Sequence, residues 1–197
     1  TLKKLHSFLE VGPGFGANIH LIQQNFSNFK KFIVIDIVPN IWVVTEYLRK
    51  LYGENVKDYL LTREMKEIKF RDDTSLEIFV IPPWEIEKIS SSIDCFWNSS
   101  SFVEMSPEIV KNYAEKFSNI RLIITNSTSI PKETVNDFKQ IVKNRKLATY
   151  YGLTEASRST FMIFNENSKL DKSVGKSAPG VKIKIKKFDK KLEIGEI

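Results

Sequence analysis

The feature that most constrains this chain is a glycine-rich stretch near its start, residues 10–16 (EVGPGFG). It follows an apolar run containing Leu5, Phe8 and Leu9, and it precedes a segment whose apolar residues share one helical face. Glycine has no Cβ, so the backbone can turn tightly there and approach a ligand closely. The helix that follows directs its free N–H groups toward the same place. A strand, a glycine turn and a helix are the parts of a nucleotide-binding crossover, which this stretch therefore predicts.

Strand-like and helix-like segments alternate along most of the chain. Continuous apolar runs predict strands buried on both faces, and apolar residues at helical spacing predict helices. The predicted strands are 5–11, 32–35, 77–81, 93–97, 121–125 and 147–150, and the predicted helices are 17–26, 39–52, 107–117 and 131–143. Residues 54–75 are polar and poorly patterned. The alternation predicts an α/β fold with a Rossmann-like, mostly parallel sheet and flanking helices.

Composition limits the class of protein. The chain has 197 residues, of which 42% are hydrophobic, as in a globular protein of one large or two small domains. No apolar run is long enough to span a bilayer, and no signal-peptide pattern precedes Leu2, so we expect a cytoplasmic protein. Cys95 is the only cysteine, and His6 and His20 are the only histidines. These counts exclude an internal disulfide and a metal site built from several cysteines or histidines.

The net charge of +6 owes much to lysines in the last thirty residues. There the lysines alternate with Val181, Ile183 and Ile185, which is the period of a half-buried strand, predicted over 181–187 with the lysines in solvent. No aromatic residues interleave with the lysines, which argues against a nucleic-acid surface. We expect neither nucleic acid nor a membrane as a partner, and a small C-terminal β element.

Asp36 accompanies the glycine turn at the expected distance. It ends the second predicted strand, twenty residues after Gly16, where an acidic residue accepts hydrogen bonds from ribose hydroxyls. The spacing G-x-G-x-G differs from the G-x-G-x-x-G that places a pyrophosphate on the helix N-terminus. Glu10 would repel a pyrophosphate and favour a cationic ligand. The sequence thus predicts a ribose-bearing cofactor with a positive charge.

The glycine stretch resembles motif I of the S-adenosylmethionine-dependent methyltransferases. Residues 8–16, 34–40 and 94–105 (DCFWNSSSFVEM) together resemble the sugar O-methyltransferase family, over about residues 5–118. The resemblance implies S-adenosylmethionine as the cofactor and a sugar hydroxyl as the acceptor. It implies these cofactor contacts: Glu10, Gly12 and Gly14 at the methionine end, Gly16 in the same turn, Asp36 at the ribose, and Trp84 beside the adenine.

Two points stay open within this resemblance. Trp84 either stacks on adenine or packs in the core, and Ser101 either faces the acceptor sugar or caps a helix. The catalytic candidates are Asp94, Asn98 and Glu104, and the sequence identifies no convincing general base.

A second resemblance begins near residue 121. Residues 121–197 resemble the adenylate-forming superfamily of acyl- and aryl-CoA ligases, through a strand, a small-residue loop, a helix, a strand and the Y-G-x-T-E motif at 151–155. Residues 173–181 (SVGKSAPGV) resemble the next motif of that superfamily. The implied cofactors are ATP and Mg²⁺, and the implied substrate is a carboxylic acid.

The residue roles implied by this second resemblance are chemically consistent. They are stacking of Tyr151 on adenine beside Gly152, binding of the α-phosphate by Thr154, and binding of Mg²⁺ by Glu155. Asn126 departs from the usual glycine. No glycine-, serine- and threonine-rich phosphate loop precedes the segment, and the chain stops before the superfamily's ribose-binding aspartate and catalytic lysine. We therefore expect this segment to lack the parts that hold the triphosphate.

These observations predict a truncated methyltransferase-like part over 1–119 and an adenylate-forming-enzyme-like part over 120–197, joined by gene fusion, by gene shuffling or artificially. The leading function is S-adenosylmethionine-dependent O-methylation of a sugar. The alternatives are a fragment of an ATP-dependent acyl-adenylate-forming ligase and an inactive fusion or scaffold. We expect one continuous sheet, with residues 122–125 beside 93–97 and 147–150 next beyond, because right-handed crossovers allow the two parts to share it. The strand 181–187 should lie outside that sheet or at its margin.

Overall fold

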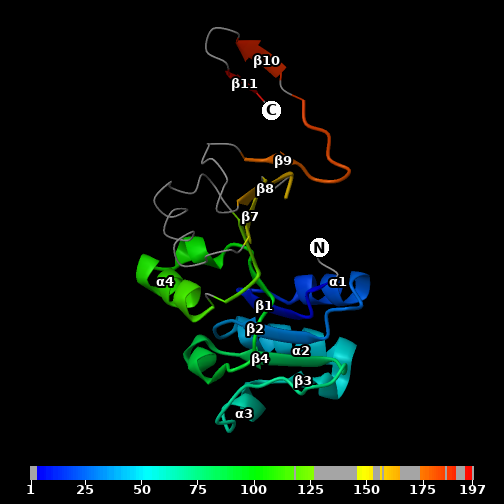
Figure 1. Ribbon diagram of the computed structural model, residues 1–197, viewed down its shortest axis with the longest axis vertical. Coiled ribbons are helices and arrows are strands. Elements are labelled where there is room, and N and C mark those ends of the chain that lie inside the picture. The colour runs from blue at the N-terminus through cyan, green and yellow to red at the C-terminus, as the bar shows by residue number, and fades with distance from the viewer. Residues whose placement is uncertain are drawn as a thin grey trace.

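The computed structural model describes residues 4–117, 119–126, 146–152, 156, 158–164, 174–184, 186–189 and 194–196. The predicted helix 131–143 lies outside these residues, as do Thr154 and Glu155. Figure 1 shows one large twisted sheet with helices on both of its faces.

The main sheet has nine strands in the order β3-β4-β2-β1-β5-β6-β7-β8-β9. Their bounds are β1 Ser7–Val11, β2 Lys31–Ile35, β3 Val56–Lys57, β4 Glu77–Ile81, β5 Cys95–Asn98, β6 Leu122–Asn126, β7 Lys146–Tyr151, β8 Thr160–Phe164 and β9 Lys176–Ser177. All neighbours from β3 to β7 pair in parallel, whereas β8 and β9 are antiparallel. The predicted mostly parallel α/β fold is confirmed.

The order of the six long parallel strands is that of a doubly wound sheet. Read across the sheet, β4-β2-β1-β5-β6-β7 are the third, second, first, fourth, fifth and sixth of these strands along the chain. In such a sheet the order reverses between the first and fourth strands, here β1 and β5, and ligands bind outside the carboxyl ends at that point. Pairing of β5 with β6 and of β6 with β7 confirms that the sheet runs without interruption across the predicted junction.

Helices cover the two faces of this sheet. The α-helices are α1 Ala17–Asn25, α2 Asn40–Tyr52, α3 Tyr59–Thr62 and α4 Pro107–Lys116, and the 3₁₀ helices are η2 Gly53–Asn55, η3 Pro83–Lys88 and η4 Ser101–Glu104. Alternate residues of each strand face opposite sides. On one side Phe8 packs with Ile19 of α1 and Val44 of α2, and on the other Leu9 packs with Tyr113 of α4. Figure 1 shows α4 across the sheet from α1 and α2.

Several elements differ from the sequence-based expectations. The poorly patterned stretch 54–75 contains η2, β3 and α3, which are too short for a periodicity to reveal. The antiparallel strand β8 was not predicted. Residues 181–184 form no strand, so the prediction of a strand over 181–187 is wrong there. Its last part enters a separate antiparallel pair, β10 Lys186–Asp189 with β11 Ile194–Glu196, which Figure 1 shows beyond β9 and outside the main sheet, as expected.

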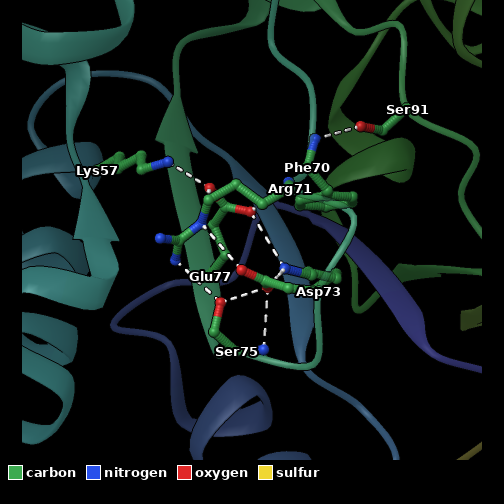
Figure 2. Close-up of polar contacts among 8 residues, drawn as sticks. Lys57, Phe70, Arg71, Asp73, Ser75, Glu77 and Ser91 are labelled. Carbon is green, nitrogen blue, oxygen red and sulfur yellow. Dashed lines mark hydrogen bonds and ion pairs between the residues drawn. The ribbon is translucent and has the colours of Figure 1, made fainter.

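A buried acid anchors the amino end of β4. The Glu77 side chain is 0% exposed, and its carboxylate is paired with Lys57, with Lys31 Nζ at 3.4 Å and with Arg71 Nε at 3.5 Å. The Arg71 N–H also donates to Glu77 Oε2 at 2.9 Å, as Figure 2 shows. Burial alone would raise the pKa of Glu77, but these hydrogen bonds and positive charges outweigh it and hold the pKa below its ordinary value. This cluster ties the loop before β4 to β2 and β3.

Helix length and polarity also bear on membrane contact. Within the ranges given above, every helix is too short or too polar to cross a bilayer.

Candidate functional site

The carboxyl ends of β1, β2 and β4 form the floor of the candidate site. The Gly12 N–H donates to the Ile35 carbonyl oxygen at 2.9 Å, and the Asp36 N–H donates to the Ile81 carbonyl oxygen at 3.3 Å. These bonds hold three strand ends at one level, beside the reversal of strand order between β1 and β5. The predicted glycine turn and Asp36 therefore come together where a doubly wound sheet binds ligands.

The three glycines of the turn do different work. All three have positive φ, at 70° for Gly12, 60° for Gly14 and 94° for Gly16. Residues other than glycine rarely adopt this backbone conformation. A Cβ on Gly12 would lie 2.6 Å from Ser101 Cβ, and one on Gly16 would lie 2.9 Å from Val44 Cγ2. A Cβ on Gly14 would meet no described atom within 4 Å. Gly12 and Gly16 thus serve packing, and Gly14 presents bare backbone to open space.

Asp36 has an unused hydrogen-bonding atom at this place. The residue is 7% exposed, Oδ1 accepts from the Ile37 N–H at 2.8 Å, and Oδ2 has no partner among the residues that the structure describes. Burial raises the pKa of this carboxyl, and the Ile37 N–H opposes that increase. The Asn40 side chain and the Gly14 N–H also lower the pKa from nearby, without making a hydrogen bond to Oδ2. A buried acceptor without a partner carries a free-energy cost that a ligand hydroxyl would remove.

Glu10 lies beneath the turn and does not line its surface. It is 0% exposed, its Oε1 accepts from Asn18 Nδ2 at 2.6 Å and from Ser99 Oγ at 3.2 Å, and its Oε2 has no described partner. Burial raises the pKa of Glu10 to about 7, although Asn18, Ser99 and the charge of Arg158 favour the ionised form; Asp36 adds to the increase. This carboxyl therefore changes charge near neutral pH.

Trp84 stands at the end of β4 and is 64% exposed. Its ring meets Tyr59 edge to face, with 6.2 Å between the centroids. Packing of Trp84 in the core, one of the two alternatives, is therefore wrong. An exposed ring beside the carboxyl ends of the strands remains suited to stacking on a base.

The three catalytic candidates do not converge. Asp94 precedes β5 at the amino end of the sheet, where Oδ2 accepts from the His6 N–H at 2.7 Å and Oδ1 from Arg121 Nη1 at 3.2 Å. It lies at the amino ends of the strands, whereas the glycine turn lies at their carboxyl ends. Glu104 is an exposed residue of η4.

Asn98, by contrast, lies at the glycine turn. It is fully buried, its Nδ2 donates to the Val11 carbonyl oxygen at 3.2 Å and to Ser101 Oγ at 2.5 Å, and its Oδ1 accepts from the Phe102 N–H at 3.2 Å. Ser101 in turn donates to the Val11 carbonyl oxygen at 3.2 Å. These bonds hold the loop after β5 against the end of β1, so Asn98 has a structural role at the site.

A second polar group, which no pattern in the sequence predicted, is formed by Asn18, Ser99, Tyr150 and Arg158. These residues come from α1, the loop after β5, β7 and the loop after β7, and they meet Glu10 or one another. Up to 140 positions separate them. Only the order of the strands brings them together, and no local pattern carries that information.

The second predicted constellation is described only in part. Tyr151 ends β7, paired with Thr160 of β8, and both Tyr151 and Gly152 are half-buried. Thr154 and Glu155 lie outside the described residues, so the predicted phosphate and Mg²⁺ contacts stay predictions. Within the described part of the chain, histidine, cysteine, aspartate and glutamate form no group of three or more with a metal-binding arrangement.

Comparison with known proteins gives one family. The model of the family described as AMP-binding enzyme matches residues 77–197, beginning at β4 and thus well before the predicted junction. No curated protein matches the chain.

Solved structures of low sequence identity also resemble it. The mitomycin 7-O-methyltransferase MmcR matches 80% of this chain at 9% identity with a TM-score of 0.45, and the pyocyanin biosynthetic protein PhzM matches 78% at 12% identity with a TM-score of 0.39. The chain spans 35% of the length of either structure.

Proposed function

The chain belongs to the AMP-binding enzyme family through residues 77–197; because that match leaves the glycine turn outside it, we propose a separate role for the turn. The turn and Asp36 bind S-adenosylmethionine, and the protein transfers its methyl group to an oxygen of a small molecule, a sugar hydroxyl in the first instance. The observation that carries the proposal is the buried Asp36 Oδ2, which lacks a described partner and lies at the same strand ends as the open backbone of Gly14.

Each part of such a cofactor has a candidate contact. The ribose hydroxyls would donate to Asp36, the exposed Trp84 ring would stack on the adenine, and the methionine end would lie over Gly14. A pyrophosphate fits less well at the turn than a sulfonium does, since Glu10 beneath the turn carries negative charge above pH 7. This electrostatic preference supports a sulfonium and disfavours a pyrophosphate.

The bound cofactor would supply an electrophilic methyl group. In the transfer the methyl–sulfur bond breaks as the methyl–oxygen bond forms, and the hydroxyl proton leaves to a base or to water. The contribution of the protein is to hold the two reactants in line, which by itself accounts for a large share of such rate accelerations. The hydrogen bonds of Asn98 and Ser101 to the Val11 carbonyl oxygen would fix the end of β1, over which the cofactor and the acceptor hydroxyl would meet.

The first experiment is calorimetric titration with S-adenosylhomocysteine and, in parallel, with NAD. We expect saturable binding of S-adenosylhomocysteine and much weaker binding of NAD. Binding of NAD without binding of S-adenosylhomocysteine would contradict the methyltransferase proposal, because both ligands offer an adenosine and differ in the group next to the turn.

The pH dependence of cofactor binding tests the role of Glu10. As pH rises from 6 to 8 the Glu10 carboxyl loses its proton, so affinity for S-adenosylmethionine should increase. Charges roughly 10 Å apart at an effective dielectric of about 20 interact by about 1–2 kcal/mol, which corresponds to about tenfold in affinity. The variant Glu10→Gln should show a flat profile, and S-adenosylhomocysteine, which lacks the sulfonium, a shallower one. A steep increase that survives in Glu10→Gln would assign the effect to another group.

A second candidate function follows from the family itself, namely ATP-dependent activation of a carboxylic acid with Tyr151 beside the adenine. The family match and the position of Tyr151 at the end of a strand of the same sheet favour it. We nevertheless expect ATP–pyrophosphate exchange to stay at background over a panel of carboxylic acids, since residues 1–197 contain no glycine-rich phosphate loop before this motif. Robust exchange would make acid activation the leading function.

A further inference from the structure

Arg158 reaches Asn18, in the first turn of the helix after the glycine turn, from the part of the chain that carries the family match. We propose that Arg158 is a positioning residue for the cofactor turn, acting through Asn18 on the start of α1 and on Glu10. The role of Arg158 in cofactor binding rests on the proposed function. Its effect on Glu10 can be tested on the protein without ligand.

The surroundings of Arg158 hold its guanidinium in one place. The group lies 5.5 Å from the centroid of the Trp97 ring and 5.6 Å from that of Tyr150, within the range of cation–π attraction. Tyr150 is itself fixed, since its hydroxyl donates to the Ser99 carbonyl oxygen at 2.5 Å. The φ of Arg158 is 57°, a left-handed conformation that costs about 1–2 kcal/mol for a residue with a Cβ. The surrounding structure thus maintains a strained backbone that delivers this side chain to the site.

Asn18 connects Arg158 to the buried acid. Its Oδ1 accepts from Arg158 Nη2 at 3.2 Å, and its Nδ2 donates to Glu10 Oε1 at 2.6 Å and to Ser99 Oγ at 3.1 Å. Both ends of the amide are therefore used, which fixes its orientation. Asn18 is the second residue of α1, whose N-cap, Gly16, has no side chain to bond the first N–H groups. The Asn18 contacts instead tie the first turn of α1 to β1 and to the loop after β5.

The charges around Glu10 give this arrangement an electrostatic consequence. Arg158 favours the ionised Glu10, Asp36 disfavours it, and Tyr150 and Cys95 lie close enough to sense its charge. Burial is the dominant effect and raises the pKa of Glu10 to about 7. Removal of the Arg158 charge should raise it further, so that Glu10 is mostly neutral at pH 7. If the Arg158–Asn18 hydrogen bond only joined two segments of the chain, removal of the Arg158 charge would leave the pKa of Glu10 unchanged.

The test compares Arg158→Gln and Arg158→Lys with the matched charge loss Arg63→Ala, which removes an exposed arginine paired with Glu64. The readouts are the Glu10 carboxyl titration by ¹³C NMR without ligand and the pH midpoint of S-adenosylmethionine binding. We expect Arg158→Gln to raise both midpoints by at least about 0.5 pH unit. Arg158→Lys should keep them near the wild-type values, because its charge remains although the planar donor is lost. Arg63→Ala should leave them unchanged.

The two readouts separate this inference from the proposed function. Absence of S-adenosylmethionine binding in the wild type would refute the proposed function, while the ligand-free Glu10 titration would still decide the link to Arg158. An unshifted Glu10 titration in folded Arg158→Gln would overturn the inference, as would an equal shift in Arg63→Ala. If Arg158→Gln does not fold, a wild-type-like Glu10 titration in Asn18→Ala would overturn it instead.

Discussion

Replacing Asp36 with alanine is expected to weaken the binding of S-adenosylhomocysteine by at least about 100-fold. Two ribose hydroxyls that donate to a carboxylate contribute about 1.5–3 kcal/mol each, and every 1.4 kcal/mol is about tenfold in affinity. The carboxylate is buried and has a free acceptor, so water does not readily replace it. Calorimetric titration of wild type and variant under one condition measures the loss.

A matched control distinguishes the ribose contact from a loss of charge. Asp72→Ala removes an exposed carboxylate from the loop before β4, at the amino ends of the strands and away from the glycine turn. It should leave the affinity within about twofold. Asp36→Asn retains one acceptor oxygen and should fall between the wild type and Asp36→Ala. Equal affinities for Asp36→Ala and the wild type would remove the principal support for an adenosine-containing cofactor at this turn.

The largest expected effect on stability is that of Glu77→Ala. Loss of one partner from a buried ionic cluster costs about 3–5 kcal/mol, because it leaves charge uncompensated. Here Lys57 loses its acid, whereas Lys31 and Arg71 keep Asp73 at 2.9 and 3.8 Å, which places the expected loss near the lower limit. Urea denaturation should show the lower free energy of unfolding. Glu64→Ala, which removes an exposed acid paired with Arg63, should change it by less than about 1 kcal/mol.

The pH dependence gives Glu77 a signature. Since its pKa is lowered in the folded protein, its contribution is present above the ordinary glutamate pKa and is lost as pH falls through the lower, folded value. The difference between the wild type and Glu77→Gln should therefore be largest at neutral pH and shrink in acid. A difference that stays constant down to low pH would mean that packing, and not charge, sets the cost.

The parts of the fold that the sequence predicts well are those encoded locally. Runs such as 32–35 and 78–81 are buried on both faces, so their apolar residues are continuous, which is typical of strands in a parallel sheet. Gly14 and Asp36 were predicted because a crossover fixes the number of residues between a turn and the end of the next strand. The expectation that β5, β6 and β7 lie side by side followed from the handedness of crossovers and was confirmed.

What the sequence did not predict depends on direction in three dimensions. Whether Trp84 points inward or outward after two prolines depends on the η3 turn, and the chain gives no periodicity there. Asp94 belongs to the most specific stretch of the methyltransferase resemblance, yet it lies at the amino end of β5, whereas Asn98 lies at the carboxyl end of that strand. The approach of Arg158 to Asn18 requires the complete strand order, since it joins the first helix to the loop after β7.

The central position of β1 has a consequence for the synthesis of the protein. β1 is made before the other strands of this sheet, and β2 can pair with one of its edges early, but its other edge pairs with β5, which is completed about 60 residues after β2. At about 5–20 residues per second, a growing chain would carry that apolar edge uncovered for about 3–12 s. An uncovered edge of this kind pairs readily with other chains. Between the emergence of β2 and that of β5, the nascent chain thus carries an edge that a chaperone would protect from aggregation.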